Sequence, residues 1–170
     1  MDTVSLSEPD LLQRYQALLK DRGGMRARNA AAVLGVSEGE LLARRVGLDV
    51  LRLRCEPKEI LQAVTSLGEV MALTRNDACV HERMGVYGNF SFAGHVALAV
   101  NPDIDLRMFL SHWSSAFAVE ENGRQSLQFF DHTGEAAHKI YLTEASNQEA
   151  YQALLARFTA IEQQDWIEPI

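Results

Sequence analysis

The sequence has few of the features that mark secreted, membrane-spanning or disulfide-stabilised proteins. It contains only two cysteines, Cys55 and Cys79, which are too far apart to form a CxxC pair. No apolar stretch approaches the ~18 residues that a membrane-spanning helix requires, and no apolar run follows a basic N-terminus. We therefore expect a protein of the reducing cytoplasm with no membrane span.

Positive charge is also scarce. The chain has 16 lysines and arginines against 23 acidic residues, a formal net charge of -7 and a pI near 5.2. This balance disfavours long-range attraction to nucleic acid or to an anionic membrane. Hydrophobic residues make up 47% of the 170 residues, which is typical of a globular protein and excludes disorder. We expect a single domain over residues 1–170.

Helical spacing dominates from about residue 9 to residue 67, which we interpret as a helical cap. Pro9 is expected in the first turn of an amphipathic helix. Ser37 and Glu40 form an S-x-x-E capping box that predicts the start of another helix. A further helix is expected over 57–67, beginning at a proline and followed by a glycine.

The first of these helices form a helix–turn–helix pattern that carries four arginines: Arg26, Arg28, Arg44 and Arg45. These side chains could contact phosphates, so a DNA-binding or regulatory module is the alternative function. The same pattern also caps sheets in many folds. The acidic balance of the chain favours the cap, and nucleic acid is not the expected partner.

After Gly68 the hydrophobic residues recur at every second position, which predicts an antiparallel sheet over about residues 69–143. The expected strands are 69–75, 78–83, 85–92, 94–101, 104–111, 114–120, 125–131 and 136–143. Turn residues separate most of them, so sequential pairing is the simplest topology. Helical spacing returns at about 147–163. Helices, then a strand meander, then a helix predict an α+β fold.

The segment IDLRMFL alternates most clearly between the two faces of a strand. One face is apolar and is predicted to join the core: Ile104, Leu106, Met108 and Leu110. The other face carries Asp105, Arg107 and Phe109. A guanidinium on such a strand reaches solvent, pairs with an acid such as Asp105, or meets an anionic ligand. Arg107 and Phe109 are therefore candidate binding residues, alongside the simpler interpretation of sheet packing.

His81, in ACVHERMG, is a candidate metal ligand because a neutral imidazole binds iron and other transition metals. A single strand histidine is more often exposed or hydrogen-bonded. The other histidines show no paired metal spacing: His95, His112, His132 and His138. The sequence has no recognisable Ser-His-Asp order or glycine-rich phosphate loop.

Four segments resemble the N-terminal half of the HemS/ChuS-type hemin-degrading proteins of bacterial haem uptake. They are RARNAAAVLGVSEGELLARRVG, LGEVMALTRNDACVHERMGVYGN, GHVALAVNPDIDLRMFLSHWSSAF and SLQFFDHTGEAAHKIYLTE, in family order. The similarity runs from about Leu11 to Phe158. It implies a cytoplasmic protein that binds haem delivered by an inner-membrane haem transporter, and that carries or degrades it. Family members contain two homologous repeats with haem between them.

The resemblance also implies roles for three residues. Arg107 matches the distal-side arginine and so is the candidate catalytic residue, and Phe109 matches a ring of the distal pocket. His81 matches a secondary haem ligand, so it is the candidate ligand of the haem iron. The usual proximal histidine lies beyond the segment matched here, which leaves haem degradation by this single repeat open. Homodimerisation or a second homologous repeat would supply the missing half.

Overall fold

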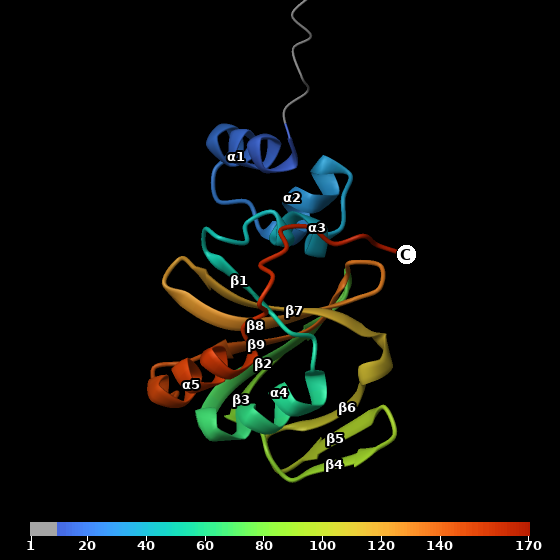
Figure 1. Cartoon of the computed structure of the whole chain (residues 1–170), viewed down its shortest axis with the longest axis vertical. Coiled ribbons are helices and arrows are strands. Elements are labelled where there is room, and N and C mark those ends of the chain that lie inside the picture. Colours follow the sequence, from blue (N-terminus) through green and yellow to red (C-terminus); the bar gives the residue numbers. More distant parts are fainter. Residues whose placement is uncertain (1–9) are drawn as a thin grey trace, which may run out of the picture.

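Nine strands and five α-helices form the part of the chain that the computed structural model describes, residues 10–170. Pro9, the expected first residue of the helical cap, lies outside the described residues. Figure 1 shows the N-terminal helices at one end of the molecule, the strands in the middle and two further helices beside the strands. The predicted α+β class is confirmed.

Three short helices form the N-terminal cap: α1 (Leu11–Arg22), α2 (Ala27–Leu34) and α3 (Glu38–Ala43). The capping box expected at Ser37 is present. The Ser37 hydroxyl accepts a hydrogen bond from the Glu40 amide, and the Glu40 carboxylate accepts one from the Ser37 amide. These bonds satisfy two donors that have no partner within the helix.

Two further helices lie beside the strands. The helix α4 (Pro57–Val64) continues into a 3₁₀ turn, η1 (Thr65–Leu67), and together they cover the helix expected over 57–67. The helix α5 (Gln148–Phe158) ends before the expected residue 163. The chain after it follows strand β1 instead, where the Gln163 side chain bonds both backbone groups of Arg52. These contacts satisfy part of an otherwise open strand edge.

The strands form two antiparallel sheets. The large sheet has the order β1 (Val50–Leu53), β7 (Trp113–Glu121), β8 (Arg124–Asp131), β9 (Ala136–Leu142), β2 (Glu69–Arg75) and β3 (Val80–Val86). The small sheet has the order β4 (Phe90–Ala93), β5 (Val96–Val100) and β6 (Asp105–Phe109). A second 3₁₀ turn, η2 (Leu110–His112), connects β6 to β7.

The expectation of purely sequential pairing is only partly correct. Neighbouring strands do pair within β2–β3, β4–β6 and β7–β9. However, β9 pairs with β2 and β1 pairs with β7, so the chain leaves the large sheet after β3, builds the small sheet and then returns. The four-residue strand β1 lies inside the segment read as a helical cap. It is too short to show a period, and its pairing partner lies far along the sequence.

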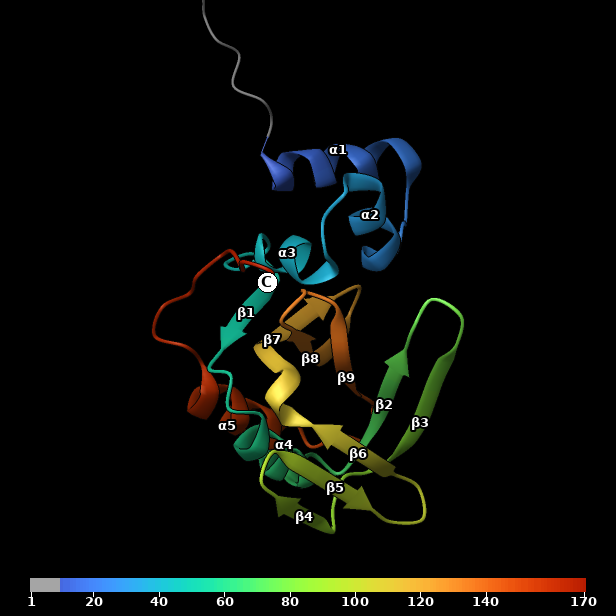
Figure 2. The same ribbon diagram turned by 90° about the vertical axis from the view of Figure 1, so that its right-hand side faces the viewer.

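One hydrophobic core joins the two sheets. It contains Val70 and Ile140 from the large sheet, Ala97 and Met108 from the small sheet, and Leu61 from α4. Figure 2 shows the small sheet below the large one, and α4 and α5 also lie in the lower part of the molecule. Because the small sheet buries one face in this core, its other face is left outward. No helix among residues 10–170 is long and apolar enough to cross a membrane.

Gly134 fixes the contact between the N-terminal cap and the large sheet. It has a φ of 83°, and a side chain there would collide with the Ser37 hydroxyl at the start of α3. Its carbonyl accepts a hydrogen bond of 2.8 Å from the Gly39 amide. Gly123 has a similar φ of 73° but has no atom within 4 Å of an added Cβ. Comparing substitutions at the two positions therefore distinguishes the effect of backbone strain from the effect of a collision.

We predict that Gly134→Ala lowers the free energy of unfolding by about 1–3 kcal/mol more than Gly123→Ala does. Both substitutions place a side chain at positive φ, but only the first also forces the α3 cap away from the sheet. Denaturant unfolding followed by circular dichroism measures the difference. Equal stability of the two variants would show that this contact is not a packing constraint.

Candidate functional site

The predicted alternation along β6 is confirmed by the structure. Ile104, Met108 and Leu110 are buried, and Leu106 is half-buried. Arg107 is exposed, and Phe109 retains 56% of its surface, which is unusual for a phenylalanine within a strand. The same residues that anchor the small sheet in the core therefore leave Arg107 and Phe109 facing outward.

The neighbouring strand β5 adds an apolar surface beside these residues. Cross-strand pairing places Leu98 opposite Arg107, Val96 opposite Phe109 and Val100 opposite Asp105. Val96 and Leu98 are only half-buried, and Val100 is 44% exposed. We call this surface the outer face of the small sheet: Val96, Leu98, Val100, Arg107 and Phe109. The strand at 94–101 was expected, but the pairing that places its apolar residues beside Arg107 could not be read from one strand.

Arg107 has no acidic partner within residues 10–170. Asp105 lies on the same face and was the expected alternative partner, yet the two form no ion pair. An arginine beside exposed leucine, valine and phenylalanine side chains offers a charged donor next to a flat apolar surface. This arrangement suits a planar, largely apolar ligand with an anionic edge.

His81 is placed by the large sheet. It lies near the start of the edge strand β3, opposite Thr74 of β2, and its side chain is exposed. Because side chains alternate along a strand, His81 and Arg83 share one face of β3, while Val80 and Glu82 share the other. An exposed imidazole on an edge strand is accessible to an external ligand.

The fold does not bring His81 into contact with Arg107. Strands β3 and β6 approach each other near Gly85, where an added Cβ would lie 3.0 Å from Ile104. The Arg83 guanidinium also donates to the Asp103 carboxylate at 2.8 Å, just before β6. His81 lies in β3 of the large sheet, and Arg107 lies in β6 of the small sheet. Figure 2 shows that β3 and β6 extend in different directions from this junction.

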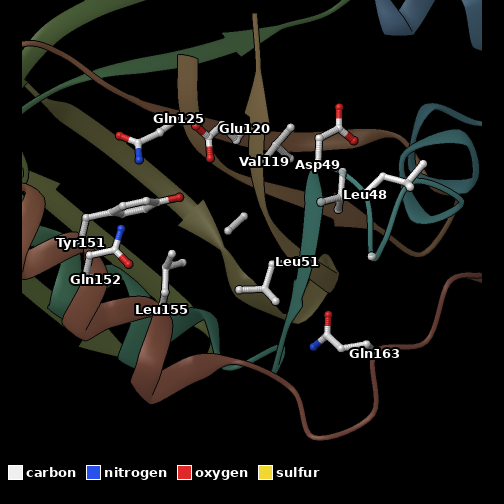
Figure 3. A pocket seen from close by; sticks show the side chains of 13 residues that line it. Leu48, Asp49, Leu51, Val119, Glu120, Gln125, Tyr151, Gln152, Leu155 and Gln163 are labelled. Atoms are coloured by element: carbon white, nitrogen blue, oxygen red, sulfur yellow. The ribbon is translucent and has the colours of Figure 1, made fainter. Parts of the chain in front are cut away.

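Figure 3 shows a different cavity, between α5 and the β1 edge of the large sheet. It has a volume of about 440 Å³, and its walls include Leu51, Leu155 and Tyr151. Burial, with a smaller effect of Glu120, raises the pKa of Tyr151 to about 12, so the phenol stays protonated. The charged residues that line the cavity are two acids, Asp49 and Glu120, and the lining contains no lysine or arginine. This cavity therefore disfavours an anionic ligand.

A buried polar cluster that the sequence did not reveal lies inside the core. His138 of β9 is fully enclosed; its Nδ1 atom lies 3.0 Å from the Thr74 hydroxyl, and its Nε2 atom bonds the Tyr87 hydroxyl. Burial lowers the pKa of His138 to about 4, because the protein interior disfavours the charged imidazolium. The side chain is neutral at pH 7, and its role is to hold Thr74 and Tyr87 in the core by hydrogen bonds. In the sequence, the only signal for the burial of His138 is its position on the same face of the predicted strand as Ile140.

The arginines of the helix–turn–helix pattern have different environments. Arg45 is buried and pairs with Asp49 and Glu121, and Arg28 pairs with Asp77 and Glu135. Arg26 and Arg44 are exposed. Two of the four side chains proposed for phosphate contacts thus already serve internal ion pairs.

No cluster of three or more His, Cys, Asp or Glu side chains that could hold a metal ion occurs within residues 10–170. Within these residues His81 is a single candidate ligand, which suits a metal that brings its other ligands with it. A metal already bound by four ring nitrogens meets that condition.

A family model described as the haemin-degrading HemS.ChuX domain matches residues 35–158. The chain belongs to this family. The match contains both sheets, α3, α4 and α5, with His81, Arg107 and Phe109 inside it. The family resemblance recognised in the sequence is confirmed.

Relatives of this family are similar in sequence and in structure. HmuS, a hemin transport protein of Yersinia pestis, is 45% identical over 153 residues, which are 87% of this chain and 44% of HmuS. Apo-PhuS, a heme-binding protein from Pseudomonas aeruginosa, is 46% identical with a TM-score of 0.90, over 94% of this chain and 48% of PhuS. ChuS, an E. coli heme oxygenase, is 38% identical with a TM-score of 0.84, over 91% of this chain and 47% of ChuS.

The chain therefore spans about half the length of the relatives that it matches. ChuX, in contrast, is aligned over 94% of its own length, with a TM-score of 0.70. At 16% identity, ChuX shows a shared fold alone. The fold of this chain thus occurs both as half of a longer protein and as nearly the whole of a shorter one.

His138 gives a prediction about acid stability. Its pKa of about 4 in the folded state lies below the 6.5 of a free histidine. The unfolded chain therefore binds a proton as the pH falls below 6.5, while the folded chain does not until about 4. The free energy of unfolding therefore keeps its full value, as far as His138 is concerned, above pH 6.5. It falls by about 3 kcal/mol between pH 6.5 and pH 4.

We expect His138→Gln to flatten the fall in unfolding free energy between pH 6.5 and pH 4. Urea unfolding at several pH values measures this slope. His112→Gln is the matched control because His112 is exposed and should keep the wild-type slope. An unchanged slope in His138→Gln would contradict the assignment of a neutral, buried imidazole.

Proposed function

We propose that this chain binds haem on the outer face of the small sheet and carries it in the cytoplasm of a bacterium that takes up haem. An inner-membrane haem transporter would be the donor. The observation that carries the proposal is an exposed Arg107 within an apolar face, with no ion-pair partner among residues 10–170. The relatives described as hemin transport or heme-binding proteins support it. None of them supports the DNA-binding alternative.

The outer face of the small sheet matches the chemical requirements of haem. Val96, Leu98 and Phe109 would contact the apolar macrocycle, since they keep exposed surface on one side of a sheet. Arg107 would donate hydrogen bonds to a propionate, or to a group beside the iron if it lies on the distal side. The bound haem would supply iron and the oxidisable porphyrin ring.

We further propose that His81 binds the haem iron. Its imidazole is exposed and accessible to a metal. However, the fold separates His81 from Arg107, so a second homologous unit offers the simplest way to use both residues on one haem. That unit would be a second repeat in a longer protein or another copy of this chain. Haem would then lie between two units.

For this chain alone, the proposal is binding and carriage. ChuS, described as a heme oxygenase, is about twice as long as the segment that aligns with this chain. We therefore propose ring opening only for a protein that holds both repeats. In that protein Arg107 would be the distal-side residue, holding donors beside the iron in a site shielded from water.

We expect His81→Ala to weaken haem binding at least about tenfold, because the iron loses a protein ligand. A titration of the chain with haem, followed by the Soret band, measures both affinity and coordination. His132→Ala is the matched control, since His132 is exposed and lies in the turn between β8 and β9. A Soret band that is the same in wild type and His81→Ala would remove His81 as the ligand.

The same titration tests haem binding itself. We predict saturation at one haem for each chain, or for each pair of chains if a second copy completes the site. Sedimentation of the titrated sample distinguishes the two stoichiometries. Absence of any Soret shift in both the monomer and the associated species would refute haem binding by this chain.

We expect Arg107→Ala to weaken haem binding about threefold to tenfold without moving the Soret maximum. For this chain alone we place the arginine at the anionic edge of haem, and we propose a position beside the iron only for the protein with both repeats. Arg44→Ala removes another exposed arginine and should bind haem like wild type. If Arg44→Ala weakens binding as much as Arg107→Ala does, the effect would reflect net charge and not this site.

A further inference from the structure

A second cavity lies on the other face of the large sheet, beneath the N-terminal helices. It has a volume of about 490 Å³, which is within the range of small-molecule sites. Val80 and Glu82 line it, so the intervening His81 points to the opposite face of β3. Figure 2 shows α1 and α2 above the strands that form its floor. The cavity is thus separate from the outer face of the small sheet.

Basic side chains outnumber acidic ones in this cavity, although the whole chain has a net charge of -7. The basic side chains are Arg26, Arg28, Arg75, Arg124 and Lys139, and the acidic ones are Glu38, Glu82 and Glu121. A local excess of positive charge on an acidic protein indicates an anionic ligand more specifically than it would on a basic one.

Ion pairs neutralise the acids more completely than the bases. Glu38 is paired with Lys139, and Glu121 lies 3.5 Å from Arg45 outside the cavity lining. Arg28 pairs with Asp77 and Glu135, which also lie outside the lining. After these pairs are removed, the cavity keeps three arginines and one glutamate without a partner among residues 10–170: Arg26, Arg75, Arg124 and Glu82.

Arg75 stands out among these three arginines. Its Nε atom is buried and has no hydrogen-bond partner within the described part of the chain. A buried guanidinium donor without a partner costs free energy. The Arg124 guanidinium lies 4.4 Å from the centre of the Tyr141 ring. Both residues line the same cavity.

The first turn of α2 adds backbone donors to this cavity. Arg26, Ala27 and Asn29 line it, and no side chain caps the helix N-terminus. The first turn also contains no acidic residue. Unsatisfied amides at a helix N-terminus attract anions because of their donors and the positive end of the helix dipole. These donors reinforce the arginines but would not define a site without them.

We propose that this cavity binds a small polyanion through phosphate or carboxylate groups. One anionic group is held by Arg75 and the α2 N-terminus, and a second is held by Arg124. Planar guanidinium groups and backbone amides both suit phosphate and carboxylate oxygens. The site is independent of haem and lies in a part of the fold that includes α1 and α2, which precede the family match at residue 35.

Isothermal titration of the 170-residue chain with inorganic pyrophosphate and, separately, with citrate tests the proposal. We expect at least one of these anions to bind at low salt and to bind more weakly as sodium chloride is added. Tighter binding of pyrophosphate identifies a phosphate ligand, and tighter binding of citrate identifies a carboxylate ligand. Arg75→Gln and Arg124→Gln should each weaken binding about tenfold.

Two control variants make the test specific. Arg44→Gln removes an exposed arginine outside the cavity, and Arg107→Gln removes the unpaired arginine of the small sheet; both should bind the anion like wild type. Arg124 is exposed, so Arg124→Gln should fold even if Arg75→Gln does not. The proposal is overturned if neither anion binds, if Arg124→Gln binds like wild type, or if a control variant weakens binding equally.

Discussion

The burial of one face of the small sheet is the constraint on which the candidate haem site depends. Ala97, Ala99 and Met108 enter the same core as the large sheet, α4 and α5. Since a strand alternates sides, this burial forces Leu98 and Arg107 outward together. A shift of register by one residue would exchange the two faces and bury the arginine. The position of Arg107 is thus a consequence of core packing.

The way the chain passes between its two sheets explains the other features of the site. The small sheet is inserted between β3 and β7, so both of its ends are tied to the large sheet. The contact of Gly85 with Ile104 and the bond from Arg83 to Asp103 fix one of these ends. His81 and Arg107 therefore occupy set positions on separate sheets. This separation is the reason that the proposed haem site includes a second unit.

Sequence could predict the local parts of this arrangement and not the distant pairings. The alternation from Ile104 to Leu110, the Ser37 capping box and most strand positions follow from neighbouring residues, and the structure bears them out. The pairing of β9 with β2 joins distant segments, as does the enclosure of His138 by Tyr87 and Thr74. No local pattern specifies such contacts. The roles of His81, Arg107 and Phe109 remain predictions that the fold accommodates.

The central claim is that haem lies on the outer face of the small sheet. Nuclear magnetic resonance of the ¹⁵N-labelled chain tests it most directly, because paramagnetic ferric haem broadens the signals of nearby amides. We predict that broadening is strongest at residues 96–100, at residues 105–109 and around His81, and that the first turn of α2 keeps sharp signals. Broadening centred on the cavity beneath the N-terminal helices, or on the α5 cavity, would contradict the account.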